Sequence, residues 1–267
     1  MNKRGQVSTF AIIGIVLIVL IALFLFLRDR IYFGPASEKS LQDEFPPIEE
    51  HFKTCLIEKG NERIRQMGLQ GGYLDPAEGT YLSYLNNQVS YRGWNIPNQR
   101  YCRTRILTEK DMETSLSLKL KDDLKTQCLN IGSFKKINLN VDEIGDLKID
   151  VDIGEDTTLL TANQKIIISK KDISVEQDKF SVNIDLPFGR LYDASVDIVR
   201  EECGSGIFDT LLYNVAKTQT TLKPYLCQKL QPYPDKLYLC KIKDVPPTPD
   251  NEFIFQFAIE DEPRRGL

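Results

Sequence analysis

Histidine is almost missing from this chain, because His51 is the single one among 267 residues. No two of the six cysteines have the Cys-x-x-Cys spacing of zinc and redox motifs, so we expect no metal site and no cofactor. A surplus of basic residues is missing too, since 34 Lys and Arg face 38 Asp and Glu, for a formal net charge of −4. The sequence therefore predicts neither a nucleic-acid partner nor an enzyme.

A long apolar segment lies near the N-terminus. Residues 10–27 contain no charged or hydrogen-bonding side chain, and the stretch without charge covers residues 5–27. At about 1.5 Å per residue, this stretch makes a helix of roughly 34 Å, which is enough to cross a hydrocarbon core of about 30 Å. A cleaved secretory signal is shorter and ends at a small-residue site. We therefore expect a retained single-pass anchor over residues 6–30, with the lipid bilayer as its partner.

The residues before this segment carry a family resemblance. Residues 3–8 read Lys-Arg-Gly-Gln-Val-Ser and resemble the class III signal peptide of archaeal type IV pilin-like proteins. The resemblance implies cleavage between Gly5 and Gln6, which would remove residues 1–5 as a leader. That family often has Glu at the fifth mature position, where this chain has Phe10. The remainder is similar in style to uncharacterised membrane-anchored archaeal surface proteins, a resemblance that implies no activity.

All six cysteines follow the apolar segment, and their even number favours disulfides and an extracytoplasmic domain. They are Cys55, Cys102, Cys128, Cys203, Cys227 and Cys240. A Pro-Tyr-Pro-Asp turn signal favours a local hairpin that pairs Cys227 with Cys240. Antiparallel packing of two predicted helices would pair Cys55 with Cys128, which leaves Cys102 for Cys203. The alternative is that the thiols are reduced and buried.

The region after the anchor is predicted to begin with a stalk and two helices. Gly-Pro and Pro-Pro pairs interrupt residues 31–47 and predict a short, bent stalk. In the helical and loop region of residues 48–135, the apolar spacing predicts helices over 48–67 and 107–129. Thr108 is expected to cap the second helix, and the Gly- and Tyr-rich stretch between the helices is expected to be mostly loop.

From residue 136 the apolar period changes from that of a helix to that of a strand. Residues 137–141, 147–153 and 180–186 alternate apolar with polar side chains, and a turn is expected at 143–146. Further strands are predicted at 158–169, 173–175 and 253–259, with a helix around 191–198. Residues 136–267 are thus predicted to form an antiparallel sheet region with a helix and a C-terminal strand. The expected fold class is α+β, with the meander packed on helices.

One segment of the predicted loop combines the only Trp with tyrosines and arginines. Such side chains are favoured anchors of contact surfaces. The candidate partner-binding residues are Tyr91, Arg92, Trp94, Arg100, Tyr101, Arg103 and Arg105. The alternative is that these side chains pack the loop onto the helices.

Together these features predict a structural or interaction protein of the cell envelope, without catalytic activity. Its N-terminus would lie on the cytoplasmic side of the cytoplasmic membrane, and the bulk of the chain would lie on the extracytoplasmic side. Another envelope protein or a polysaccharide is the expected partner, and self-association is a further option. The alternative function is a pilin-like or minor pilin subunit of a type IV filament. An envelope enzyme is a third class, which would require acidic and basic side chains to converge in space.

Overall fold

The part of the chain that the computed structural model describes begins at residue 45. It comprises residues 45–96, 102–128, 140–170, 173–205, 208–220, 224–231, 235–242 and 252–260. The predicted leader, the predicted anchor and residues 31–44 of the predicted stalk lie outside these residues. Within the described ranges, no helix is both long and apolar enough to cross a membrane. The anchor therefore stays a prediction, whereas the described part has an α+β fold.

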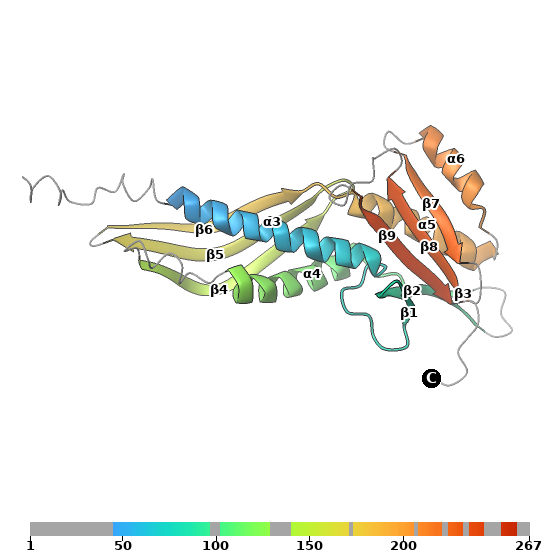
Figure 1. Cartoon of the computed structure of the whole chain (residues 1–267), viewed down its shortest axis with the longest axis horizontal. Helices are drawn as coiled ribbons and strands as arrows, with labels where there is room; N and C mark the ends of the chain where they lie inside the picture. The colour runs from blue at the N-terminus through green and yellow to red at the C-terminus, as the bar shows by residue number, and fades with distance from the viewer. Residues whose placement is uncertain are drawn as a thin grey trace, which may run out of the picture.

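Four α-helices and two β-sheets make up the described residues (Figure 1). The helices are α3 (Phe45–Leu69), α4 (Glu109–Asp123), α5 (Phe188–Ser205) and α6 (Thr210–Thr220). The strands are β1 (Tyr81–Tyr84), β2 (Asn87–Asn95), β3 (Cys102–Thr104), β4 (Asn140–Ile153), β5 (Thr158–Lys170), β6 (Ile173–Ile184), β7 (Tyr225–Gln231), β8 (Lys236–Ile242) and β9 (Ile254–Glu260).

The smaller sheet is the predicted antiparallel meander, with strand order β4-β5-β6. Its alternating apolar side chains, such as Leu160, Ala162 and Phe180, are fully buried. Helices α3 and α4 cover these side chains, and the rings of Phe52 and Phe180 lie 4.7 Å apart. The predicted packing of the meander on helices is confirmed.

Two of the predicted strand breaks are wrong. The stretch expected to turn at residues 143–146 continues as β4, with an irregular register between Ile144 and Lys148. Gly145 lies at this bulge with φ +82°, a conformation that favours glycine. Because turns also favour glycine, a bulge and a turn have the same signature in the sequence. The two strands expected at 173–175 and 180–186 are likewise parts of one strand, β6, which ends at Ile184.

The larger sheet has the order β1-β2-β9-β8-β7, and β3 also pairs with β2. All its pairings are antiparallel except that of β2 with β9, which is parallel, so the sheet is mixed. This pairing brings residues of the regions 48–135 and 136–267 into one sheet. The stretch expected to be mostly loop contains β1, β2 and β3, and Leu85 and Asn86 form the tight turn of a hairpin at φ 46° and 66°.

Helix α3 connects the two sheets (Figure 1). It begins at Phe45, so the Pro pair expected in the stalk lies in its first turn, where proline is tolerated. Along its length α3 packs on β6, and near its end Arg65 Nη1 donates to the Glu252 carbonyl at 2.7 Å, just before β9. A bidentate ion pair from Arg63 to Asp123, at 2.6 and 2.9 Å, fixes α3 against α4.

The remaining helices agree only partly with the sequence prediction. Helix α4 has the expected cap, since the Asp111 amide donates to Thr108 Oγ1 at 3.2 Å. Helix α5 covers the predicted apolar residues around 191–198 and packs on β3, β8 and β9. Helix α6 was not predicted and packs on β7. Asn214 of α6 makes two hydrogen bonds with the backbone of Cys227, at 2.8 and 2.9 Å.

The start of α5 is closely packed and offers a test of the fold. A Cβ atom on Gly189 would lie 2.5 Å from the Gly154 carbonyl oxygen, whereas one on Gly204 would meet nothing within 4 Å. We expect Gly189→Ala to lower the free energy of unfolding by about 1–3 kcal/mol, because backbone must move. The matched variant Gly204→Ala should change it by no more than about 1 kcal/mol. If urea unfolding gave the same change in free energy for both variants, α5 would not lie so close to the backbone at Gly154.

Candidate functional site

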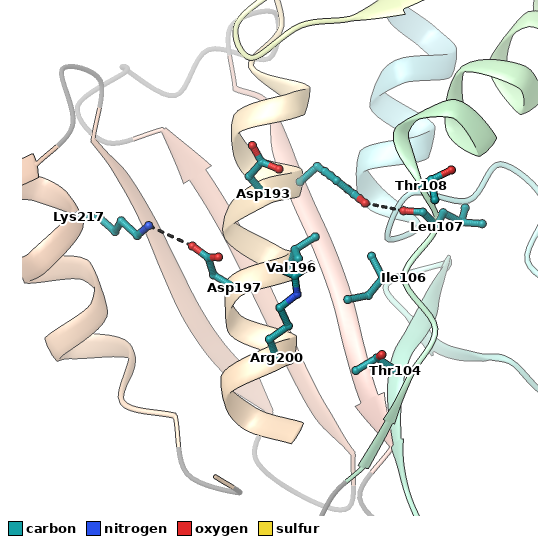
Figure 2. Close-up of a pocket in the computed structure, with 10 residues that line it drawn as sticks. Thr104, Ile106, Leu107, Thr108, Asp193, Val196, Asp197, Arg200 and Lys217 are labelled. Carbon is teal, nitrogen blue, oxygen red and sulfur yellow. Dashed lines mark hydrogen bonds and ion pairs between the residues drawn. The ribbon is translucent and has the colours of Figure 1, made fainter. Parts of the chain in front are cut away.

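A groove beside α5 is the candidate site, with a cavity volume of about 710 Å³ (Figure 2). This volume is within the range of small-ligand sites. Residues of the segment around β3, of α5 and of α6 form its walls. They are Thr104, Ile106, Leu107, Thr108, Tyr192, Asp193, Val196, Asp197, Arg200 and Lys217.

One face of α5 supplies most of the charged groups of the groove. Asp193, Val196, Asp197 and Arg200 follow helical spacing and therefore project on the same side. Figure 2 shows these side chains along α5, with Asp197 turned toward Lys217 of α6 and Val196 on the side of the segment that carries Thr104 to Thr108. The opposite face of α5 is apolar and buried against the larger sheet. This burial fixes the orientation of the helix and hence that of the groove side chains.

The facing wall is attached to α5 at two points. The Tyr192 hydroxyl donates to the Leu107 carbonyl oxygen at 2.5 Å. A disulfide joins Cys102 of β3 to Cys203 of α5, with a Cα–Cα distance of 4.7 Å. The wall then runs into the capped start of α4 at Thr108. The backbone of the groove is therefore held in place without a ligand.

Arg92 lies on the buried side of Tyr192 and is only 1% exposed. Its Cζ atom is 4.8 Å from the centroid of the Tyr192 ring and 5.6 Å from that of Phe255. Nη1 donates to Ser195 Oγ, but Nε and Nη2 have no hydrogen-bond partner among the described residues. Burial lowers the pKa of Arg92 to about 10, although aromatic hydroxyl groups nearby favour its charged form. Arg92 thus supports the groove from the core.

The charges in the groove are only partly paired. Lys217 Nζ lies 3.0 Å from Asp197, which also accepts a hydrogen bond from the Tyr213 hydroxyl at 3.4 Å. Asp193 and Arg200 are exposed and have no ion pair with any residue that the structure describes. Partial burial, followed by repulsion from Glu109, raises the pKa of Asp193. Among the described residues that line the groove, the Asp193 carboxylate and the Arg200 guanidinium therefore have no ion-pair partner.

The structure separates the predicted partner-binding residues into different environments. Tyr91 is buried and its hydroxyl donates to Asp235 at 2.6 Å, and Arg92 is buried as described. Trp94 is half-buried. Arg103 and Arg105 are exposed, the latter 5.7 Å from the Tyr73 ring, whereas Arg100 and Tyr101 lie outside the described residues. Tyr91 and Arg92 thus lie in the core, whereas Arg103 and Arg105 lie on the surface.

Asp193 and Arg200 were not found from the sequence. Their seven-residue separation is the ordinary spacing of charges on the solvated face of a helix. The predicted segment nevertheless forms part of the groove, since Thr104 lies between Arg103 and Arg105. The composition therefore draws attention to a segment that borders the groove, whereas Asp193 and Arg200 of α5 have no such signal in the sequence.

All six cysteines are paired in the structure. Cys55 pairs with Cys128, Cys102 with Cys203 and Cys227 with Cys240, the three pairs favoured by the sequence. The first joins α3 to the π-helical turn Leu124–Cys128 that follows α4, and the last joins β7 to β8. The disulfides predicted from the cysteine count are thus present.

The groove has no group of side chains suited to a metal. Among the described residues, no cluster of three His, Cys, Asp or Glu side chains could hold an ion. Comparison with family models, curated proteins and solved structures finds no match to this chain. The function is therefore inferred from the sequence and the structure of this chain alone.

The support given by Arg92 can be measured. Arg92→Met keeps the length of the side chain and removes the two donors without partners, so we expect the free energy of unfolding to change by less than about 1 kcal/mol. Arg92→Ala leaves a cavity beside the rings of Tyr192, Phe255 and Phe257 and should cost about 2–5 kcal/mol. Chemical unfolding of the disulfide-intact protein measures both changes. If Met were as costly as Ala, the guanidinium group itself would be required.

Proposed function

We propose that the protein is a single-pass membrane-anchored protein that acts by binding a partner outside the cytoplasmic membrane. The apolar residues 10–27 are its anchor, and the disulfide-bonded α+β domain carries the binding groove. The groove residues bind rather than catalyse in this proposal.

The observation that carries the proposal is the complete pairing of the cysteines. Each disulfide joins two different elements, so all three cross-link the domain rather than its surface loops. Disulfides of this kind persist in oxidising compartments and are rare in the cytosol. Together with an apolar segment long enough to span a bilayer, they favour a domain outside the membrane.

The position of the groove also supports a role in binding. The described chain begins at Phe45, and the 25 residues of α3 extend for about 37 Å from there. The end of α3 contacts β9, in the larger sheet that α5 covers. Helix α5, which forms one wall of the groove, thus lies toward the C-terminal end of α3 (Figure 1). A partner can approach the groove there.

Helix α6 presents a further surface of the kind used in association. Leu211, Leu212 and Val215 are 75%, 70% and 57% exposed and lie on the face of α6 that points away from β7. Exposed apolar side chains gathered on one face often mark an interaction site. They support an interaction function rather than a purely structural one.

A pilin-like subunit is the second candidate, because residues 3–8 resemble a class III signal peptide. In that case the mature chain would begin at Gln6, and the protein would sediment as filaments. The anchored monomer or small oligomer that we propose would instead be extracted by detergent. N-terminal sequencing combined with sedimentation of native membranes separates these two functions.

The proposed location predicts which lysines a membrane-impermeant amine reagent can reach. The Lys110 side chain is 82% exposed, so it should be labelled in intact cells. Lys3 precedes the anchor and should react only after permeabilisation. Peptide mapping by mass spectrometry reads out both sites in one sample. Labelling of Lys110 only in lysed cells would contradict an external domain.

The groove should be the place where the partner is held. A photoreactive amino acid at Thr104, which lines the groove and is exposed, should give a cross-linked adduct in intact cells. The matched control is the same substitution at Thr114, an exposed threonine on α4. Adducts at both positions, or at neither, would refute the groove as the binding surface.

A further inference from the structure

The groove has opposite charges at its two ends. Asp193 and Arg200 are seven residues apart on α5, which places their Cα atoms roughly 10 Å apart along the helix. Neither forms an ion pair with a described residue. Glu109 adds negative charge near Asp193, since its charge contributes to the shift of that carboxyl group. One end of the groove thus attracts a cation and the other an anion.

The middle of the groove is neutral and apolar. Asp197 is paired with Lys217 at 3.0 Å, so its charge is largely compensated. Of the apolar residues that line the groove, Val196 is buried and Ile106 and Leu107 are half-buried, and these three are together called its floor. A ligand that matches these features has a basic group, an apolar group and an acidic group in this order.

We propose that the groove binds an extended peptide segment of a partner protein, with a basic side chain at Asp193, an apolar one on the floor and an acidic one at Arg200. In an extended chain alternate side chains share a face, and residues four apart are about 13 Å apart. The long side chains of Lys, Glu and Arg can span the difference between this distance in the peptide and the roughly 10 Å between Asp193 and Arg200 on α5. The pattern is therefore basic-x-apolar-x-acidic. This inference rests on the proposed function and names the partner's chemistry.

A polysaccharide fits the same surface less well. Sugar rings are typically held by stacking on an exposed aromatic face. Tyr192 is the one aromatic among the described residues that line the groove; it is 6% exposed, and its hydroxyl is occupied by Leu107. The apolar floor and the opposite charges favour side chains of a peptide.

Charge exchange tests the pattern with three labelled peptides. The sequences Lys-Ser-Ile-Ser-Glu, Lys-Ser-Ile-Ser-Lys and Glu-Ser-Ile-Ser-Glu share the same spacing and differ only in charge. Fluorescence anisotropy with the full chain in detergent micelles gives their dissociation constants. The native protein should bind the first peptide about tenfold more tightly than either of the others.

The variants should change this preference in a defined way. Arg200→Glu should favour the Lys/Lys peptide, and Asp193→Lys should favour the Glu/Glu peptide, each by about tenfold. Lys148→Glu alters the net charge as Arg200→Glu does, but on an exposed site of β4, and should leave the preference unchanged. These switches support the proposal.

Two results would overturn it. One is peptide binding that ignores Asp193 and Arg200, or no binding at all. The other is a neutral glucan oligosaccharide that binds where the peptides do not. Failure here is separable from failure of the proposed function, because a cross-link at Thr104 does not depend on the charge pattern of the partner. An adduct at Thr104 without peptide selectivity would reject only the peptide pattern.

Discussion

Strand β2 pairs in parallel with β9, and the rest of the larger sheet depends on this contact between distant parts of the chain. The register shifts between Tyr91 and Gly93, so the irregularity falls at Arg92. A bulge of this kind changes the direction of a side chain. Tyr91 packs with Val89 and Ala258 in a small separate cluster, whereas Arg92 contacts α5 through Tyr192. The bulge thus places α5, and with it the groove, relative to the sheet.

Local patterns predicted the elements that are local in origin. The meander β4-β5-β6 consists of neighbours along the chain, and its period-2 alternation marks the buried face directly. The cap at Thr108 depends on four adjacent residues and was predicted correctly. Strands β1 to β3 were missed because the partner that buries β2 is supplied by β9. Polar residues buried in β2, such as Ser90 and Arg92, also disrupt its apolar pattern.

The site was harder to predict than the fold because side-chain type does not reveal orientation. Tyr91 and Arg92 have the composition of a contact surface, yet both are directed into the core. Asp193 and Arg200 look like solvated helix residues until the segment after β3 is placed opposite them. Two features single them out: they form no ion pair with the described residues, and they line a groove, and neither feature is a property of local sequence.

Rigidity links the disulfides to recognition. Association costs free energy when loops must be ordered, and a site that is already fixed avoids that part of the cost. Here Cys102–Cys203 holds β3 against α5 at one end of the wall, and the hydrogen bond from Tyr192 to Leu107 holds it further along. The ordering cost then falls mainly on the ligand. A flexible segment can still bind to such a groove if its side chains gain opposite charges at both ends. In the proposed complex, Asp193 and Arg200 would provide these charges, because the ion pair among the described groove residues, Lys217–Asp197, neutralises the centre of the groove.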